Sequence, residues 1–292
     1  MQPQVITVPY RYDQRDEGLG LGPARLLEAG LAERAANVSH ASLDQEALEE
    51  DRTAVNIGRL GRSTAGLVAA TRATSSPVLV IAGDDTAAVG VVSGLQMSDG
   101  ASRALGVIWV DAHGDFNTPD TSYSGILAGM PLAVIAGLAG PRWREAAELA
   151  APVPGDRMLL VGVREIDKGE DELIQMHALG RLTTRDARDP VKIKIALSEL
   201  INRCEILYVN IDLDVLDPRH VPSITTPSAD GLEPDELSAV LAAIVGTGKV
   251  AAVSITSLNP LAGTRGDRSV SSAWEIVDKL VSDWTSVPPL PA

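Results

Sequence analysis

Six short, almost wholly apolar runs recur along this chain, and longer amphipathic stretches separate them. The runs lie at residues 5–8, 78–82, 107–110, 158–163, 206–211 and 250–255. Strands that are apolar on both faces are typical of a parallel sheet with helices packed on each side. The β–α alternation therefore predicts an α/β protein with three layers, in which a mostly parallel sheet lies between two layers of helices.

The stretches between the runs predict helices, because their apolar residues recur with helical spacing. These helices are expected at residues 24–36, 56–73, 125–137, 192–203 and 234–245. The chain has no internal repeat and no linker-like change of composition, so we expect one domain over residues 1–285. Residues 286–292 contain three prolines, and they predict a loose C-terminal tail.

Composition and charge exclude several classes of function. The chain has 292 residues, 45% of them hydrophobic, which is enough for a large core. Its net charge of −14 argues against nucleic acid or an anionic membrane as a partner. No stretch approaches the ~20 apolar residues that span a bilayer, and the N-terminus lacks a signal sequence, so a cytoplasmic protein is expected. The single cysteine, Cys204, allows no intrachain disulfide and no thiolate zinc site.

Two of the apolar runs end in alternating carboxylates. The residues concerned are Asp111, His113 and Asp115 after one run and Asp212 and Asp214 after another. Alternate side chains of an extended segment point the same way, so each group converges. Carboxylates with one imidazole favour a hard or borderline ion, Mn²⁺ before Mg²⁺ or Zn²⁺. Two such strand ends predict a site for two divalent cations.

Other polar segments also lie at the ends of apolar runs, namely residues 84–85, 164–167 and 254–257. In open α/β sheets, ligands bind beyond the carboxyl ends of the strands. We therefore expect these segments to meet the two groups of carboxylates at one edge of the sheet.

With these motifs, the chain resembles the arginase/agmatinase (ureohydrolase) family over nearly its whole length. The matching segments, in the family's order and spacing, lie at residues 22–23, 82–86, 111–115, 117–119, 124–125, 164–167, 212–218, 226–227 and 259–260. The resemblance implies an arginase-type fold, a dinuclear manganese site with a metal-bridging hydroxide, and a small amino-acid-like substrate. Members of the family often form homo-oligomers, and no patch in this sequence decides the oligomeric state.

The resemblance also implies the metal ligands. Carried over position by position, one Mn²⁺ is held by Asp85, Asp111, Asp115 and Asp212, and the other by Asp111, His113, Asp212 and Asp214. Asp85 departs from the pattern, because the family normally has histidine there. Aspartate is still an oxygen ligand, but its charge should lower the Lewis acidity of that ion and raise the pKa of its water.

Two further departures concern the substrate. Ala128 stands where arginases have a histidine used in proton transfer. Ser257 stands where the family has the glutamate that binds the guanidinium of the substrate. Removing one partner of a buried charged pair costs ~3–5 kcal/mol. Unmodified arginine is therefore expected to be a poor substrate.

Other recognition positions are retained. By resemblance, Asn117 and Ser124 hold an amino-acid carboxylate, and Asp167 faces an α-amino group. Glu165 stands where the family has aspartate, and Thr226 joins these residues in the predicted substrate site together with Ser257. A different interpretation is that Asn117 and Ser124 only cap a loop, as Asn and Ser often do.

The leading hypothesis is a dinuclear manganese hydrolase that cleaves a C–N bond at a guanidino-type or amidino-type carbon. Asp115 would take the proton of the attacking water and pass it to the leaving amine. A substrate that is neutral at working pH, such as the N-hydroxyguanidine Nω-hydroxyarginine, fits the altered site better than arginine. Two alternatives stay open, a catalytically impaired family member that binds metal or ligand in a regulatory role, and a hydrolase of another amide or formimino group.

Overall fold

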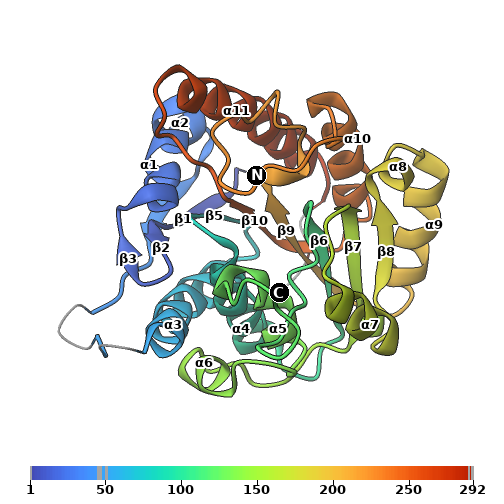
Figure 1. Cartoon of the computed structure of the whole chain (residues 1–292). Coiled ribbons are helices and arrows are strands. Elements are labelled where there is room, and N and C mark those ends of the chain that lie inside the picture. Colours follow the sequence, from blue (N-terminus) through green and yellow to red (C-terminus); the bar gives the residue numbers. More distant parts are fainter. Residues whose placement is uncertain (1, 45–47, 50–51, 289, 291–292) are drawn as a thin grey trace.

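Eight parallel strands form the central sheet of the computed structural model, which describes residues 2–44, 48–49, 52–288 and 290 (Figure 1). The strand order is β4-β1-β5-β10-β9-β6-β7-β8. The strands are β1 Gln4–Val8, β4 Asn37–His40, β5 Val78–Ala82, β6 Leu105–Val110, β7 Met158–Val163, β8 Gly180–Thr183, β9 Ile206–Asp212 and β10 Val250–Thr256. The predicted parallel sheet is confirmed, and all six apolar runs are strands in it.

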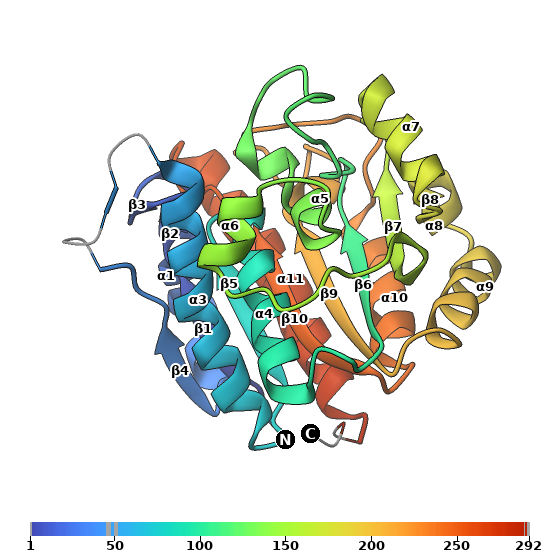
Figure 2. The same cartoon turned by 90° about the horizontal axis from the view of Figure 1, so that it is seen from below.

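Helices cover both faces of the sheet, as Figures 1 and 2 show. On one face lie α3 Thr53–Arg72, α4 Ala88–Asp99, α5 Pro131–Ile135, α6 Pro141–Ala146 and α7 Lys168–Met176. On the other lie α1 Gly22–Leu26, α8 Thr184–Ala187, α9 Pro190–Ile201, α10 Pro234–Val245 and α11 Thr264–Thr285, with α2 Ala32–Arg34 after α1. The predicted three-layer arrangement is therefore confirmed.

Each strand contributes to two cores, because successive side chains point to opposite faces of the sheet. In β5, Val78 and Val80 pack with the α3–α4 layer, whereas Leu79 and Ile81 pack with the opposite layer. Burying one such aliphatic side chain stabilises the fold by about 1.5–3 kcal/mol. The apolar character of both faces of these strands follows directly from this double packing.

Some predicted helices differ from the observed ones. The helix expected at 125–137 is wrong over its first half, where a loop and a short 3-10 turn, Leu127–Gly129, precede α5. Pro131 has no N–H and a fixed φ, so it begins a new helix instead of continuing one. The helix expected at 24–36 is interrupted at Gly30, whose φ is +136°.

The structure also contains elements that the periodicity did not predict. They include the edge strands β4 and β8, the helices α4, α6, α7, α8 and α11, and a hairpin of β2 Tyr10–Arg11 and β3 Gln14–Arg15. Of the predicted tail, residues 289, 291 and 292 lie outside the described residues. Within the described part of the chain, no helix combines the length and the apolarity that crossing a bilayer requires.

The strand order brings five polar strand ends to one edge of the sheet. The strands β5, β10, β9, β6 and β7 are consecutive neighbours, although they come from segments far apart in the sequence. Asp212 at the end of β9 lies in register with Thr256 of β10, and Ile211 lies beside Val110 of β6. Parallel pairing therefore places the residues after each of these strands close together.

Candidate metal centre

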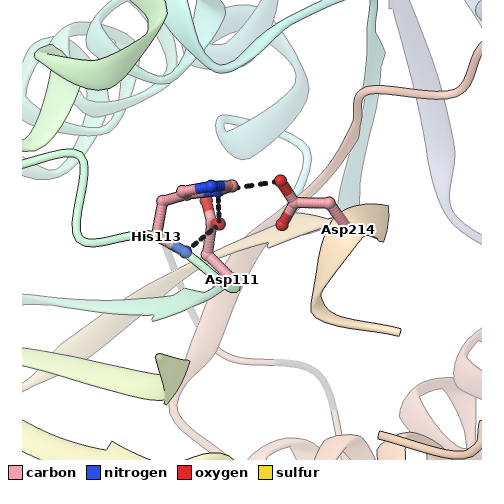
Figure 3. Close-up of side chains that lie close together, drawn as sticks. All are labelled: Asp111, His113 and Asp214. Carbon is pink, nitrogen blue, oxygen red and sulfur yellow. Dashed lines mark hydrogen bonds and ion pairs between the residues drawn. The ribbon is translucent and has the colours of Figure 1, made fainter. Parts of the chain in front are cut away.

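Asp111, His113 and Asp214 form a compact group at this edge (Figure 3). Asp111 and His113 follow β6, and Asp214 lies in a short 3-10 turn directly after β9. The Nδ1 atom of His113 is 2.9 Å from Oδ2 of Asp214 and 3.4 Å from Oδ1 of Asp111. The structure thus brings together three side chains that the sequence placed after two different strands.

A second group consists of Asp85, Asp111 and Asp115, all of them buried. In each group the possible ligand atoms lie within 4.8 Å of one another, and Asp111 belongs to both groups. Asp115 has a φ of +47°, a left-handed backbone that turns the chain after His113. Four carboxylates and one imidazole are a suitable donor set for Mn²⁺, and a carboxylate shared by two groups suits a pair of ions.

Neighbouring groups hold Asp111 in place. The indole Nε1 of Trp109 donates a hydrogen bond to Oδ2 at 3.0 Å, and the backbone N–H of His113 donates to Oδ1 at 2.7 Å. Trp109 and Asp111 are two residues apart, so they lie on the same face of the extended chain. The buried tryptophan therefore orients the carboxylate that the two groups share.

Asp212 lies beside these groups, but the sets of mutually close ligand atoms among the described residues do not include it. Its Oδ1 accepts a hydrogen bond from the backbone N–H of Asp214 at 2.6 Å. Its Oδ2 accepts one from the hydroxyl of Ser257 at 2.5 Å. The expected role of Asp212 as a second shared ligand stays a prediction.

Three donors surround the carboxylate of Asp85. Asn210 Nδ2 and Thr256 Oγ1 donate to Oδ1 at 2.6 and 2.7 Å, and Ser257 Oγ donates to Oδ2 at 3.3 Å. Asn210 in turn accepts a hydrogen bond from the hydroxyl of Tyr208. Sequence analysis missed this network, although polar residues at every second position of β9 were a signal for it.

Burial and mutual repulsion dominate the electrostatics. Burial raises the pKa of Asp85, Asp111, Asp115 and Asp212 above the usual range, and the neighbouring carboxylates raise each pKa further. Burial opposes protonation of His113, but its contacts with Asp111 and Asp214 outweigh that effect and raise its pKa to about 12. A bound divalent cation would remove the repulsion and favour ionised carboxylates.

The predicted substrate residues lie in the loops that follow β6, β7, β9 and β10. Asn117 Nδ2 donates to Oδ2 of Asp167 at 3.2 Å, and Asp167 immediately precedes α7. Thr226 Oγ1 donates to Oδ2 of Asp214 at 2.9 Å. Ser124 is exposed on the loop before α5, and Glu165 accepts a hydrogen bond from a serine hydroxyl, that of Ser228.

Two charged residues that sequence analysis left without a role support the loops. Glu170 is buried, and its two oxygens accept hydrogen bonds from the backbone N–H groups of Phe116 and Asp167 at 2.8 and 3.2 Å. Burial raises the pKa of Glu170 to about 7. Arg164 donates to the carbonyls of Asp214 and Ser228 at 2.8 and 3.0 Å. Glu170 and Arg164 thereby tie the residues after β6 and β9 to the neighbouring loops.

The remaining histidines and the cysteine are engaged elsewhere. His40 hydrogen-bonds Thr7, His220 hydrogen-bonds Glu233, and the ring of His177 packs edge-on against Phe116. Cys204 is buried, and burial raises the pKa of its thiol to about 11. None of these four side chains belongs to the two groups of possible metal ligands found among the described residues.

Comparison with known proteins gives concordant matches. A sequence model of the arginase family matches residues 2–282. The arginase of Staphylococcus aureus (strain COL) is 30% identical over 279 residues, covering 88% of this chain and 89% of the relative. The arginase of Bacillus subtilis (strain 168) is 26% identical over 289 residues, covering 95% and 96%.

A solved structure shows the same likeness in three dimensions. The native structure of the arginase from Bacillus caldovelox at pH 5.6 superposes with a TM-score of 0.84 at 27% identity. The match covers 96% of this chain and 98% of that one. The expected arginase-type fold is confirmed.

Proposed function

Because this chain belongs to the arginase family, we propose that it is a dinuclear manganese hydrolase that cleaves a C–N bond of a small guanidino-type molecule. Hydrolysis at an amidino carbon is the reaction type of the ureohydrolases. The observation that carries the proposal is the shared position of the buried Asp111 in two groups of ligand atoms, each spanning no more than 4.8 Å. The cytoplasmic location and a homo-oligomeric state stay predictions.

The proposed ligand assignment takes the two groups and adds Asp212 to each of them. Asp85, Asp111, Asp115 and Asp212 would hold one ion, and Asp111, His113, Asp212 and Asp214 the other. Two bound Mn²⁺ ions would lower the pKa of a water molecule so that it attacks at neutral pH. Cations would also offset the mutual repulsion of these buried carboxylates.

Asp115 is the proposed proton carrier of the reaction. Its carboxylate is buried, and it lies within one close group of ligand atoms with the shared ligand Asp111. A carboxylate beside the attacking water can take a proton from it and release that proton to the leaving amine. The left-handed backbone at Asp115 helps to hold it at the turn after β6.

The environment of Ser257 favours a neutral substrate. Its hydroxyl donates to Asp212 and Asp85, so no carboxylate at this position balances a guanidinium charge. Burying a guanidinium without its counter-charge would cost ~3–5 kcal/mol, as for a broken buried ion pair. An uncharged N-hydroxyguanidine such as Nω-hydroxyarginine avoids this cost. Asn117, Ser124, Glu165, Asp167 and Thr226 would recognise its amino-acid end.

A steady-state comparison tests the reaction and its substrate. With Mn²⁺ added, we expect turnover of Nω-hydroxyarginine with a higher kcat/KM than arginine or agmatine. Asp111→Asn should lose both metal and turnover, whereas Asp120→Asn, in the exposed part of the following loop, should keep both. Equal or better turnover of arginine would overturn the substrate assignment while leaving the hydrolase intact. Faster turnover of a formimino compound or another amide than of Nω-hydroxyarginine, arginine and agmatine would favour a hydrolase of that other group.

One specific observation favours a non-catalytic role instead. Both oxygens of Asp85 already accept hydrogen bonds from protein donors. A carboxylate held in this way needs no ion, which is compatible with a regulatory protein that has kept the fold. Metal analysis separates the two functions, because two Mn²⁺ per chain supports the hydrolase and metal-free protein supports the alternative.

A further inference from the structure

A network of buried polar side chains leads from the core of the sheet to Asp85. Its members are Tyr208, Asn210, Ser254 and Thr256, and none of them is more than 1% exposed. Tyr208 and Asn210 are two residues apart on β9, so both point to the face that packs with the α3–α4 layer. Asn210 lies in register with Ser254 of β10. Polar groups are costly in such an apolar layer unless each is hydrogen-bonded.

The side-chain amide of Asn210 is held from both ends. Its Nδ2 donates to Oδ1 of Asp85 at 2.6 Å, and its Oδ1 accepts a hydrogen bond from the hydroxyl of Tyr208 at 3.1 Å. The hydroxyl oxygen of Tyr208 lies 2.8 Å from Oγ of Ser254. A reversed amide would bring its carbonyl oxygen against the carboxylate of Asp85, so that two acceptors would face each other. The phenol and the carboxylate therefore favour one orientation of the amide.

These hydrogen bonds divide the two oxygens of Asp85. Its Oδ1 accepts from Asn210 at 2.6 Å and from Thr256 at 2.7 Å, which occupies both lone pairs of that oxygen. Its Oδ2 is 3.3 Å from the hydroxyl of Ser257, and that hydroxyl lies closer to Asp212, at 2.5 Å. A hydroxyl has one proton, and the shorter contact is with Asp212. Oδ2 of Asp85 is therefore the oxygen that keeps lone pairs for a cation.

We propose that Asn210 is a positioning residue that turns Asp85 so that its Oδ2 binds one of the two Mn²⁺ ions, with Tyr208 acting through Asn210. This inference rests on the dinuclear centre of the proposed function. A carboxylate that is already fixed loses less side-chain freedom when the ion binds, which strengthens binding. The group that contains His113 (Figure 3) includes no member of this network. The network should therefore support one ion and leave the other unaffected.

The variant Asn210→Leu removes the amide and tests the proposal. Titration calorimetry of the metal-free protein with Mn²⁺ gives a Kd for each ion. We expect one Kd to rise by about 10–100-fold, as for other supporting hydrogen bonds, while the second stays unchanged. The matched control is Asn56→Leu, which removes a buried amide that donates to Asp13 on another part of the fold. That control should bind both ions like the wild type.

The variant Tyr208→Phe removes a single oxygen and tests the proposal even if Asn210→Leu fails to fold. Because Asn210 keeps its own bond to Asp85 in this variant, we expect a smaller rise of the same Kd, about tenfold. The matched control is Tyr10→Phe, in which a buried hydroxyl that accepts from the backbone N–H of Leu43 is lost. Wild-type affinity for both ions in Tyr208→Phe would overturn the proposal.

A double variant distinguishes positioning from a packing defect. Tyr208→Phe/Asn210→Leu should bind Mn²⁺ like Asn210→Leu, because the phenol acts on Asp85 only through the amide. Independent packing defects would instead add their effects. Additive losses, or an equal loss of both ions together with a lower Tm, would overturn the proposal.

Electron paramagnetic resonance separates this inference from the proposed function, because it needs no turnover. With two equivalents of Mn²⁺, the wild type should give the spectrum of an exchange-coupled pair, and Asn210→Leu that of a single bound ion. A wild type that binds the pair but hydrolyses no substrate contradicts the proposed reaction alone. A paired spectrum that persists in Asn210→Leu with wild-type affinities overturns this inference alone. A wild type that binds no Mn²⁺ overturns both.

Discussion

Ser257 lies between two carboxylates, and its hydroxyl contacts both. It donates to Oδ2 of Asp212 at 2.5 Å and reaches Oδ2 of Asp85 at 3.3 Å. Its backbone has a φ of +65°, in the left-handed region. A strained serine that contacts two proposed ligands fits a role in orienting the metal centre, in addition to its position in the predicted substrate site.

Replacing this hydroxyl should weaken metal binding. In Ser257→Ala, Asp85 and Asp212 lose a hydrogen-bond donor. Alanine has to adopt the same positive φ at position 257 as serine does, so the backbone strain does not change. Loss of such a supporting hydrogen bond typically costs 10–100-fold in metal affinity, so we expect a Kd for Mn²⁺ raised by about that factor. Titration calorimetry on the metal-free protein measures it. Ser124→Ala, on an exposed loop, should bind Mn²⁺ like the wild type, and equal affinities in both variants would contradict the orienting role.

Glu170 should make stability depend on pH. Burial raises its pKa from 4.5 to about 7, so the folded state binds more protons than the unfolded state between these values. Stability then falls as pH rises through this window, by about 3 kcal/mol in total. Glu170→Gln cannot ionise and should not show this loss.

Urea unfolding of both proteins at pH 4.5 and pH 8 measures the effect of Glu170. The other buried carboxylates titrate in both proteins, so their contributions cancel in the difference. We expect the advantage of wild type over Glu170→Gln to shrink from the lower to the higher pH. A difference that stays constant would show that folding does not raise the pKa of Glu170.

At the scale of elements, α3 and α4 approach each other through glycines. A Cβ on Gly90 of α4 would lie 2.5 Å from the carbonyl oxygen of Gly61 on α3. Gly90→Ala should therefore force the helices apart and lower the free energy of unfolding by about 1–3 kcal/mol.

The same helix offers a control for that substitution. Gly66 of α3 has nothing within 4 Å of an added Cβ. Gly66→Ala should therefore raise the free energy of unfolding by about 0.5–1 kcal/mol, the usual gain within a helix. Urea unfolding of both variants checks the pair, and two shifts of the same sign would contradict close packing at Gly90.

The predictability of the elements follows from how they are buried. The six central strands were predicted because both of their faces are apolar. The edge strands β4 and β8 have mixed exposure and short length, so the same rule missed them. The helix expected at 125–137 failed at Pro131, which starts α5. Periodicity thus finds elements that are buried on a regular pattern, and local turn chemistry decides where they begin.

The site was predictable only in part, for a related reason. The convergence of Asp111 and His113 with Asp214 follows from strand alternation together with parallel pairing. The donors around Asp85 come from positions 210, 256 and 257, which reach it only through the strand order β5-β10-β9. The polar alternation within β9 was a signal that this strand carries a polar network, but a pattern within one strand contains no information about its neighbours, so the contact with Asp85 could not be predicted.

At the scale of the whole molecule, negative charge and metal binding are linked. The chain carries a net charge of −14, and several of its carboxylates lie buried at one edge of the sheet. Ions that bind the folded state alone stabilise it by about 2.7 kcal/mol for each site at a concentration of 100 times Kd. We therefore expect removal of Mn²⁺ by a chelator to lower Tm.

Thermal unfolding with Mn²⁺ and with EDTA measures this stabilisation. The Asp111→Asn variant lacks the carboxylate that both groups share, so its Tm should respond little to either addition. Wild-type protein whose Tm is the same in Mn²⁺ and EDTA would contradict a metal centre at this edge.

The two strands in the middle of the sheet, β9 and β10, are the last strands to leave the ribosome. Until then, β5 and β6 each have a partner on one side only, because β10 and β9 are their neighbours on the other side. Unpaired strand edges associate readily with other chains. The growing polypeptide should therefore depend on chaperones until residue 256 has been synthesised, and a nascent chain that stops earlier cannot assemble the centre.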